Sequence, residues 1–176
     1  LGCGMEGLLT VAALKTLGIN KIIVIDKESE KSRAMEFGAW EFIGSHGKNG
    51  VAGVKDKIRA AAGDMADAVF ICTDSPMGRN VARRFMKNSG SICEMGFLCG
   101  WRRTPTARYF EDSMPAGGRF YAARDYENCM NFLAKAAEMK LPLYKLITHR
   151  YKLEEINEAM WTVVREEGLG IAVFNR

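Results

Sequence analysis

The chain has 176 residues, of which 48% are hydrophobic and 26% charged, and its formal net charge is +4. This composition predicts a globular protein with one good core and an appendage, and it excludes a disordered chain. The basic pairs Arg83/Arg84 and Arg102/Arg103 are short and separate, which disfavours a nucleic-acid partner. No apolar run approaches a membrane span and no signal peptide is evident, so we expect no membrane partner and a cytoplasmic location.

Cysteine and histidine residues are few and scattered. The five cysteines contain no Cys-x-x-Cys pair, so neither a disulfide framework nor a zinc knuckle is predicted. Cys72 and Cys93 sit in apolar runs and are expected to be buried small hydrophobes. His46 and His149 are far apart without acidic neighbours at ligand spacing, which favours structural or surface roles. We therefore expect no metal ligand in this chain.

Helices and strands alternate through the first hundred residues. In chain order, the patterns predict a helix from Leu8 to Leu17, a strand at 21–26, a helix from Ser29 to Phe37, a strand at 39–43, a glycine-rich surface loop at 44–53, a helix from Val54 to Ala62, a strand at 66–73, a helix at 78–90 and a strand at 91–97. Repeated units of this length predict an α/β protein with a doubly wound parallel sheet.

The remaining residues are less regular. Residues 97–118 are expected to form a long loop without an assigned role. After this loop, the patterns predict a helix that Asp125 caps, a strand at 143–151, a helix at 153–168 and a strand at 170–176. The expected organisation is a dinucleotide-binding domain at 1–140 followed by a C-terminal segment at 141–176.

The opening residues form a glycine-rich motif. Gly2, Gly4 and Gly7 fit the spacing G-x-G-x-x-G, in which the glycines allow a tight turn, a close approach of a pyrophosphate and close helix packing. Such spacings also occur by chance in turns, so the context decides. Here a helix follows at once, then a strand, and Asp26 closes that strand 19 residues after Gly7. This context favours a dinucleotide site.

An acid at the end of this strand can accept hydrogen bonds from both ribose hydroxyls, and its charge repels a 2'-phosphate. Asp26 therefore favours NAD over NADP, although it can also be a helix cap or a solvated strand end. Lys31 can reach the same ribose or be a solvated lysine. A methyltransferase is the more remote interpretation, because Gly7 lies one residue too late for the usual G-x-G-x-G loop.

Two stretches carry a resemblance to a known family. "LGCGMEGLLTVAALKTLGINKIIVIDKESEKSRAMEFGA" and "LITHRYKLEEINEAM" resemble the medium-chain dehydrogenase/reductases, particularly the zinc-type alcohol, sorbitol and threonine dehydrogenases. The resemblance implies a Rossmann fold and an NAD cofactor. It also implies cofactor roles for residues in four places: Gly2, Gly4, Gly7 and the backbone of Met5 and Glu6 at the pyrophosphate, Asp26 and Lys31 at the adenosine ribose, Thr73 beside the adenosine, and Met95, Gly96 and Phe97 near the nicotinamide.

The sequence departs from the family in two ways. Ala172 stands where the family often has a basic residue that meets the pyrophosphate. In addition, the family's N-terminal domain with its catalytic zinc ligands would lie upstream of Leu1, so we expect a truncated first strand, no catalytic residue and no zinc in this chain. The C-terminal segment would return to that absent domain.

These observations predict the NAD(H)-binding part of a zinc-dependent alcohol or polyol dehydrogenase, an oxidoreductase that acts on a small-molecule alcohol as a homodimer or homotetramer. The alternative is a stand-alone dinucleotide-sensing module that binds NAD(H) to regulate a partner and catalyses nothing.

Overall fold

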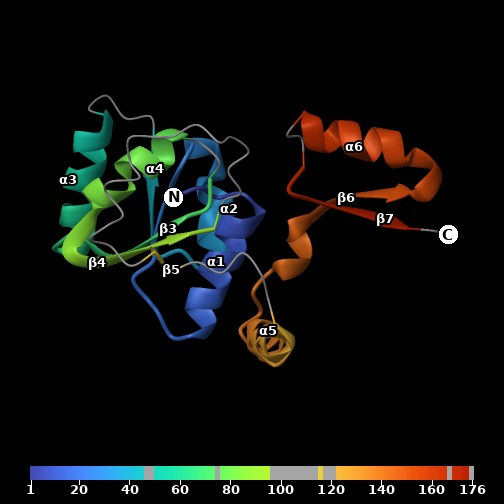
Figure 1. Cartoon of the computed structure of the whole chain (residues 1–176), viewed down its shortest axis with the longest axis horizontal. Coiled ribbons are helices and arrows are strands. Elements are labelled where there is room, and N and C mark those ends of the chain that lie inside the picture. The colour runs from blue at the N-terminus through green and yellow to red at the C-terminus, as the bar shows by residue number, and fades with distance from the viewer. Residues whose placement is uncertain (46–49, 74–75, 96–114, 117–121, 166–167, 175–176) are drawn as a thin grey trace. The chain divides into compact units, whose positions relative to one another are not determined.

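The computed structural model describes residues 1–45, 50–73, 76–95, 115–116, 122–165 and 168–174. They fall into two units, Leu1–Leu141 and Pro142–Arg176 (Figure 1). Among the described helices, none combines the length and the apolar character needed to cross a membrane.

The first unit alternates helices with short strands, as the sequence predicts. Its α-helices (α), 3-10 helices (η) and strands (β) are α1 (Met5–Thr16), β1 (Ile23–Asp26), η1 (Glu28–Glu30), α2 (Lys31–Glu36), β2 (Glu41–Gly44), α3 (Gly50–Ala62), β3 (Ala66–Ile71), α4 (Pro76–Ala82), η2 (Arg83–Phe85), β4 (Met86–Glu94), β5 (Pro115–Ala116) and α5 (Ala123–Glu138). Three of these helices are followed by glycines in the left-handed region, Gly18 after α1, Gly38 after α2 and Gly63 after α3.

The strands of this unit are parallel, and the first two residues of the chain lie between them. β1 pairs with β2, β3 with β4, and β4 with β5. The amino group of Leu1 donates to the Phe70 carbonyl (2.7 Å), and the Cys72 N–H donates to the Leu1 carbonyl (2.7 Å). On the other side, the Gly2 N–H donates to the Ile25 carbonyl (3.1 Å). The order is therefore β2, β1, Leu1–Gly2, β3, β4, β5, which confirms the predicted doubly wound parallel arrangement.

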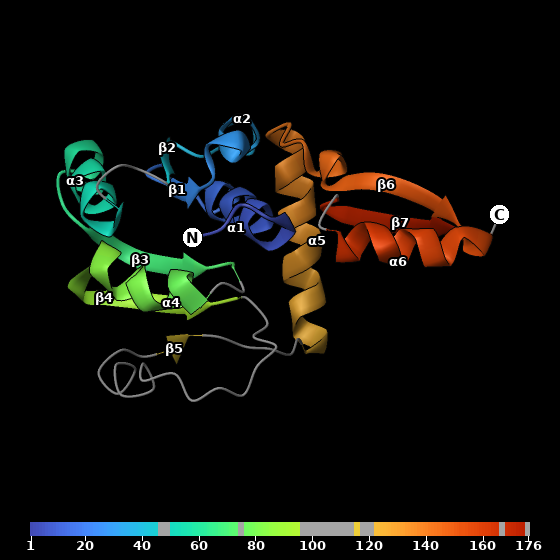
Figure 2. The same ribbon diagram turned by 90° about the horizontal axis from the view of Figure 1, so that it is seen from above.

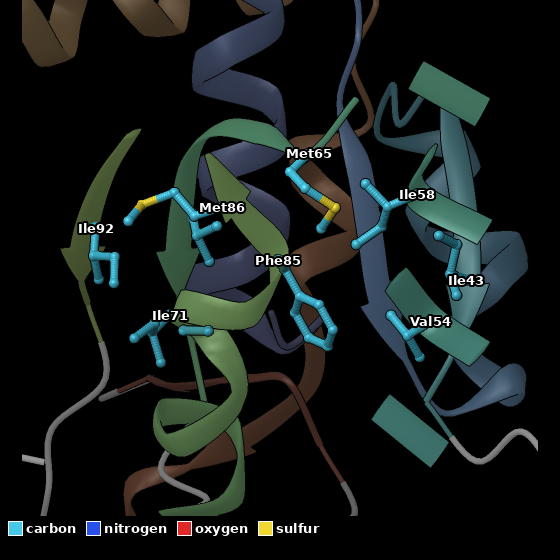
Figure 3. Packing of buried hydrophobic residues seen from close by; sticks show 10 residues of the cluster. Ile43, Val54, Ile58, Met65, Ile71, Phe85, Met86 and Ile92 are labelled. Carbon is cyan, nitrogen blue, oxygen red and sulfur yellow. The ribbon is translucent and has the colours of Figure 1, made fainter. Parts of the chain in front are cut away.

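One face of this sheet is buried along β1 to β4, and the other is buried at β1 and β2. Ile23 and Ile25 of β1 pack against a cluster of buried residues from β2, α3, the connection before β3, β3, α4, η2 and β4. Its members are Ile43, Val54, Ile58, Met65, Val69, Ile71, Ala82, Phe85, Met86 and Ile92. Figure 3 shows how most of their side chains lie between these elements. Val24 and Phe42 alternate with these residues and are buried outside the cluster. Because successive strand residues point to opposite faces, they belong to the second buried face.

The helix expected at 78–90 is shorter than predicted. α4 ends at Ala82, and β4 already begins at Met86. Phe85 and Met86 are both buried, which is what a helical period would also require. Pairing with β3 decides the outcome, because Met86 lies opposite Ala66 at the start of the ladder. Residues 91–94 of the strand expected at 91–97 are therefore the second half of β4, while 96–97 lie outside the described residues.

Three other predictions about local structure are corrected or only partly described. α3 begins at Gly50, inside the stretch expected to be a loop at 44–53. Asp125 is not the N-cap of α5. It is the third helical residue, and its carboxylate accepts the Ala122 N–H (2.7 Å), which satisfies a donor that the helix leaves free. Of the long loop expected at 97–118, only Pro115–Ala116 is described, and it pairs with β4.

The second unit is a small strand–helix–strand unit. It contains η4 (Leu143–Leu146), β6 (Ile147–Lys152), η5 (Leu153–Glu155), α6 (Ile156–Val164) and β7 (Gly170–Phe174). β6 and β7 are parallel and α6 contacts both, as Figure 2 shows. The strand expected from residue 143 begins only at Ile147, because a 3-10 turn precedes it. Ala172 lies in β7 opposite Arg150.

Candidate functional site

The glycine-rich loop joins the centre of the sheet to α1, and two of its glycines are required by contacts within the fold. Gly2 has φ +95°, and a Cβ there would lie 2.5 Å from the Cys72 carbonyl oxygen. A Cβ on Gly7 would overlap the carbonyl oxygen of Gly2. A side chain at Gly2 would therefore push the loop away from the end of β3, and a side chain at Gly7 would push α1 away from Gly2.

Gly4 is a glycine of a different kind. It is the N-cap of α1, with φ −69° and ψ −169°, which any residue can adopt. A Cβ at Gly4 would meet no heavy atom of the described residues within 4 Å. The fold thus leaves open space beside Gly4, at the end of a helix of 12 residues.

The N-terminus of α1 can accept an anion. The first N–H groups of a helix have no acceptor within the helix, and the helix dipole places partial positive charge there. The N-cap of α1 is a glycine, and among the described residues it has no side-chain cap hydrogen bond. The N–H groups in the first turn, including those of Met5 and Glu6, therefore surround a place that suits a phosphate.

Asp26 holds the glycine-rich loop against the end of β1. Its Oδ2 accepts the Cys3 N–H (2.5 Å), and its Oδ1 accepts the Lys27 N–H (2.6 Å). This is neither a helix cap nor a solvated strand end, the two structural alternatives for Asp26. A carboxylate oxygen has a second lone pair, so both oxygens can still accept a hydroxyl from a ligand.

Cys3, whose N–H binds Asp26, is buried. Its side chain is 1% exposed. Burial, followed by the negative charges of Asp26 and Glu30, raises the pKa of the Cys3 thiol to about 12. The thiol therefore stays neutral at physiological pH and acts as a packing group rather than as a nucleophile.

The remaining predicted site residues lie at varying distances from the loop. Thr73 follows β3 and reaches the loop, because a Cβ on Gly2 would be 3.1 Å from the Cβ of Thr73. The Met95 N–H donates to the Ile71 carbonyl (2.8 Å), which places Met95 at the carboxyl end of β3. The Lys31 ammonium lies 3.7 Å from Glu28, and both side chains are exposed. Gly96 and Phe97 lie outside the described residues.

Cys72 contacts the glycine-rich loop and α1, which sequence reasoning missed. It was expected to be a buried small hydrophobe, but it is only half-buried, as is Cys93. Its N–H binds Leu1, its carbonyl lies against Gly2, and its Sγ is 3.6 Å from the Thr10 hydroxyl. Burial raises the pKa of the Cys72 thiol. Its position directly after a buried strand, where ligand-binding residues gather in α/β sheets, was the available signal.

The described residues do not fit a zinc site. Within the described ranges, no three histidine, cysteine, aspartate or glutamate side chains come together as a metal would need. His149, in the second unit, lies 2.9 Å from the Thr148 hydroxyl through its Nδ1. His46 falls outside the described residues. We therefore assign no zinc chemistry to the described part of the chain.

Comparison with known proteins finds a family of dehydrogenases. The sequence profile of a family described as "Zinc-binding dehydrogenase" matches residues 7–135. Sorbitol dehydrogenases 1 and 2 of Saccharomyces cerevisiae are each 28% identical to this chain over 163 residues, which cover 90% of this chain and 45% of theirs. The chain thus spans about half the length of the curated relatives that it matches.

Solved structures share the fold. An alcohol dehydrogenase from Thermotoga maritima has a TM-score of 0.83 at 20% identity, over 98% of this chain and 48% of its own. An alcohol dehydrogenase from Escherichia coli, solved in complex with NADH, has a TM-score of 0.68 at 19% identity, over 98% of this chain and 49% of its own. The family match covers most of this chain, and the solved structures have its Rossmann-like arrangement. The chain belongs to the zinc-binding dehydrogenase family, within the medium-chain dehydrogenase/reductases.

Proposed function

We propose that this chain binds NAD(H) as the cofactor-binding part of a zinc-dependent alcohol or polyol dehydrogenase. The observation that carries the proposal is the open space beside Gly4, which lies at the uncapped N-terminus of α1, together with the carboxylate of Asp26, which accepts the Cys3 N–H of the same loop. A dinucleotide needs both features, a place for its pyrophosphate and an acceptor for its ribose hydroxyls.

Each loop residue has a distinct part in this proposal. Gly2 and Gly7 allow the loop to lie close to β3, and Gly4 leaves room for the pyrophosphate. The backbone N–H groups of Met5 and Glu6 would donate to the phosphate oxygens.

The side chains around the loop would orient the rest of the cofactor. Asp26 would accept the ribose hydroxyls, with Lys31 nearby and Thr73 beside the adenosine. Met95, followed by Gly96 and Phe97, would lie near the nicotinamide. When bound, the nicotinamide supplies the group that accepts or returns a hydride.

Asp26 is also proposed to select NAD(H) over NADP(H). Two unit charges about 4 Å apart repel by about 1 kcal/mol in water and by about 4 kcal/mol near a protein surface. A 2'-phosphate beside this carboxylate would therefore lose about fivefold to a thousandfold in affinity.

The substrate class is proposed from the relatives. The yeast proteins are named sorbitol dehydrogenases and the Thermotoga protein an alcohol dehydrogenase, which favours a small alcohol or polyol. The proposal for the whole protein includes a catalytic zinc outside the described residues, a cytoplasmic location and assembly as a homodimer or homotetramer.

Calorimetric titration of the full-length protein with NADH and with NADPH tests the cofactor assignment. We expect the unmodified protein to bind NADH more tightly than NADPH. In Asp26→Ser, the difference between the two affinities should be smaller. Asp56→Ser, an exposed aspartate on α3, is the control with the same change in charge and should leave the preference unchanged. Tighter binding of NADPH by the unmodified protein would overturn the role of Asp26.

A screen of simple alcohols and polyols, followed at the NADH absorbance, tests the activity. We expect NADH production with at least one of them. Tight NADH binding without turnover on any alcohol or polyol would favour the dinucleotide-sensing module instead.

A further inference from the structure

Two acid–base pairs follow Asp26 along the chain. η1 carries Glu28 and Glu30, and α2 places a basic residue three positions after each of them. Lys31 lies 3.7 Å from Glu28, with side chains 55% and 71% exposed. Arg33 Nη1 lies 2.6 Å from Glu30 Oε2, with side chains 42% and 25% exposed. The second pair is thus closer and better shielded from water, where an ion pair keeps more of its strength.

The two pairs lie at different places. A Cβ on Gly44, at the end of β2, would be 2.6 Å from Glu28 Oε2, so Glu28 covers the end of β2. Glu30 instead lies one turn of η1 after Asp26, because its N–H donates to the Lys27 carbonyl (3.0 Å) and the Lys27 N–H donates to Asp26 Oδ1 (2.6 Å). The backbone N–H of Cys3 is the group that Asp26 Oδ2 holds. The Glu30–Arg33 pair therefore lies close to the glycine-rich loop and the carboxylate of Asp26.

The guanidinium of Arg33 is a group that could attract a 2'-phosphate. A guanidinium is always charged, and its planar array of N–H donors matches the oxygens of a phosphate. A free arginine beside Asp26 would offset the repulsion between that carboxylate and a 2'-phosphate. In this structure the Nη1 of Arg33 is directed to Glu30 instead.

We propose that Glu30 is a specificity-determining residue, which holds Arg33 away from the position of a 2'-phosphate and so strengthens the preference for NAD(H). This inference rests on the proposed function of the loop as a dinucleotide site. Asp26 repels the phosphate, and Glu30 occupies the nearby arginine that would otherwise attract it.

The test is Glu30→Gln in the full-length protein, titrated calorimetrically with NADPH and NADH. A released guanidinium that gains one charge-assisted contact to the phosphate should strengthen NADPH binding about tenfold. NADH, which has no 2'-phosphate, should bind within about twofold of the unmodified protein. Glu127→Gln, an exposed glutamate on α5, is the control with the same change in charge, and it should change neither affinity.

A double variant separates release of Arg33 from a simple loss of negative charge. Glu30→Gln combined with Arg33→Gln should lose the NADPH gain, because no guanidinium remains to be released. The inference would be overturned if NADPH binding were still strengthened in the double variant, or if it were not strengthened in folded Glu30→Gln. In either case, NADH binding by the unmodified protein would leave the proposed function standing. Failure of the unmodified protein to bind either dinucleotide would instead overturn the proposed function and this inference together.

Discussion

Gly4→Val separates cofactor binding from folding, because Gly4 has room for a side chain in the protein alone. Its backbone conformation is one that valine adopts, and an added Cβ meets nothing within 4 Å. At an N-cap, exchanging glycine for another residue without a capping group destabilises the fold by at most about 1 kcal/mol. The same exchange lowers the conformational entropy of the unfolded chain, which stabilises the fold by a similar amount. We therefore expect the free energy of unfolding to change by less than about 1 kcal/mol.

The expected loss of NADH affinity follows from the contacts that the valine would block. Its branched side chain would fill the open space and keep the pyrophosphate from the N–H groups of Met5 and Glu6. A hydrogen bond to a charged group contributes about 1.5–3 kcal/mol. Loss of one or two of them predicts about 1.5–6 kcal/mol, which is a weakening of about tenfold to 10⁴-fold.

Calorimetric titration with NADH and urea denaturation of the same samples measure the two effects. Ala122→Val is a matched control, because Ala122 is an exposed N-cap with an extended backbone on a different helix, α5. It should leave both quantities close to those of the unmodified protein. Unchanged NADH affinity in folded Gly4→Val would refute the assignment of the loop as the phosphate site.

Four further predictions concern stability and thiol chemistry. Gly7→Ala should destabilise the fold by at least about 1–3 kcal/mol, seen as a lower urea midpoint, because its Cβ would overlap a backbone carbonyl; an unchanged midpoint would contradict the loop geometry. In native protein at pH 8, a thiol reagent should modify exposed Cys129 and leave Cys3 unmodified until urea is added, as mass spectrometry of the labelled peptides will show. Because the pKa of Cys3 is raised to about 12 in the fold, the folded chain retains a proton that the unfolded chain releases; stability should therefore fall as the pH rises from about 9 towards 12, and Cys3→Ala should reduce this slope. Thr162→Val should cost about 1 kcal/mol in thermal or urea unfolding, because it removes the 2.7 Å hydrogen bond to the Tyr151 hydroxyl at a buried position; an equal loss on top of Tyr151→Phe would show that this bond is not the cause.

Local patterns in the sequence were sufficient for much of the fold. The period of apolar residues identified the alternation of helices and strands, because a buried face repeats every two or every 3.6 residues. The G-x-G-x-x-G spacing and the acid that closes β1 located the candidate loop, because those requirements fall within 26 residues of one another. The structure places Gly2, Gly7, Asp26 and Thr73 around that loop, and their part in binding stays a prediction.

The tertiary structure decided the features that depend on distant partners. Leu1 and Gly2 lie between β1 and β3 through hydrogen bonds to residues as far along the chain as Phe70 and Cys72. β4 begins at Met86, where a helical period was equally compatible with burial, because its backbone pairs with β3. A side-chain period records which residues are buried, but it contains no information on which strand supplies the hydrogen-bond partner, so these contacts emerge only when the sheet assembles.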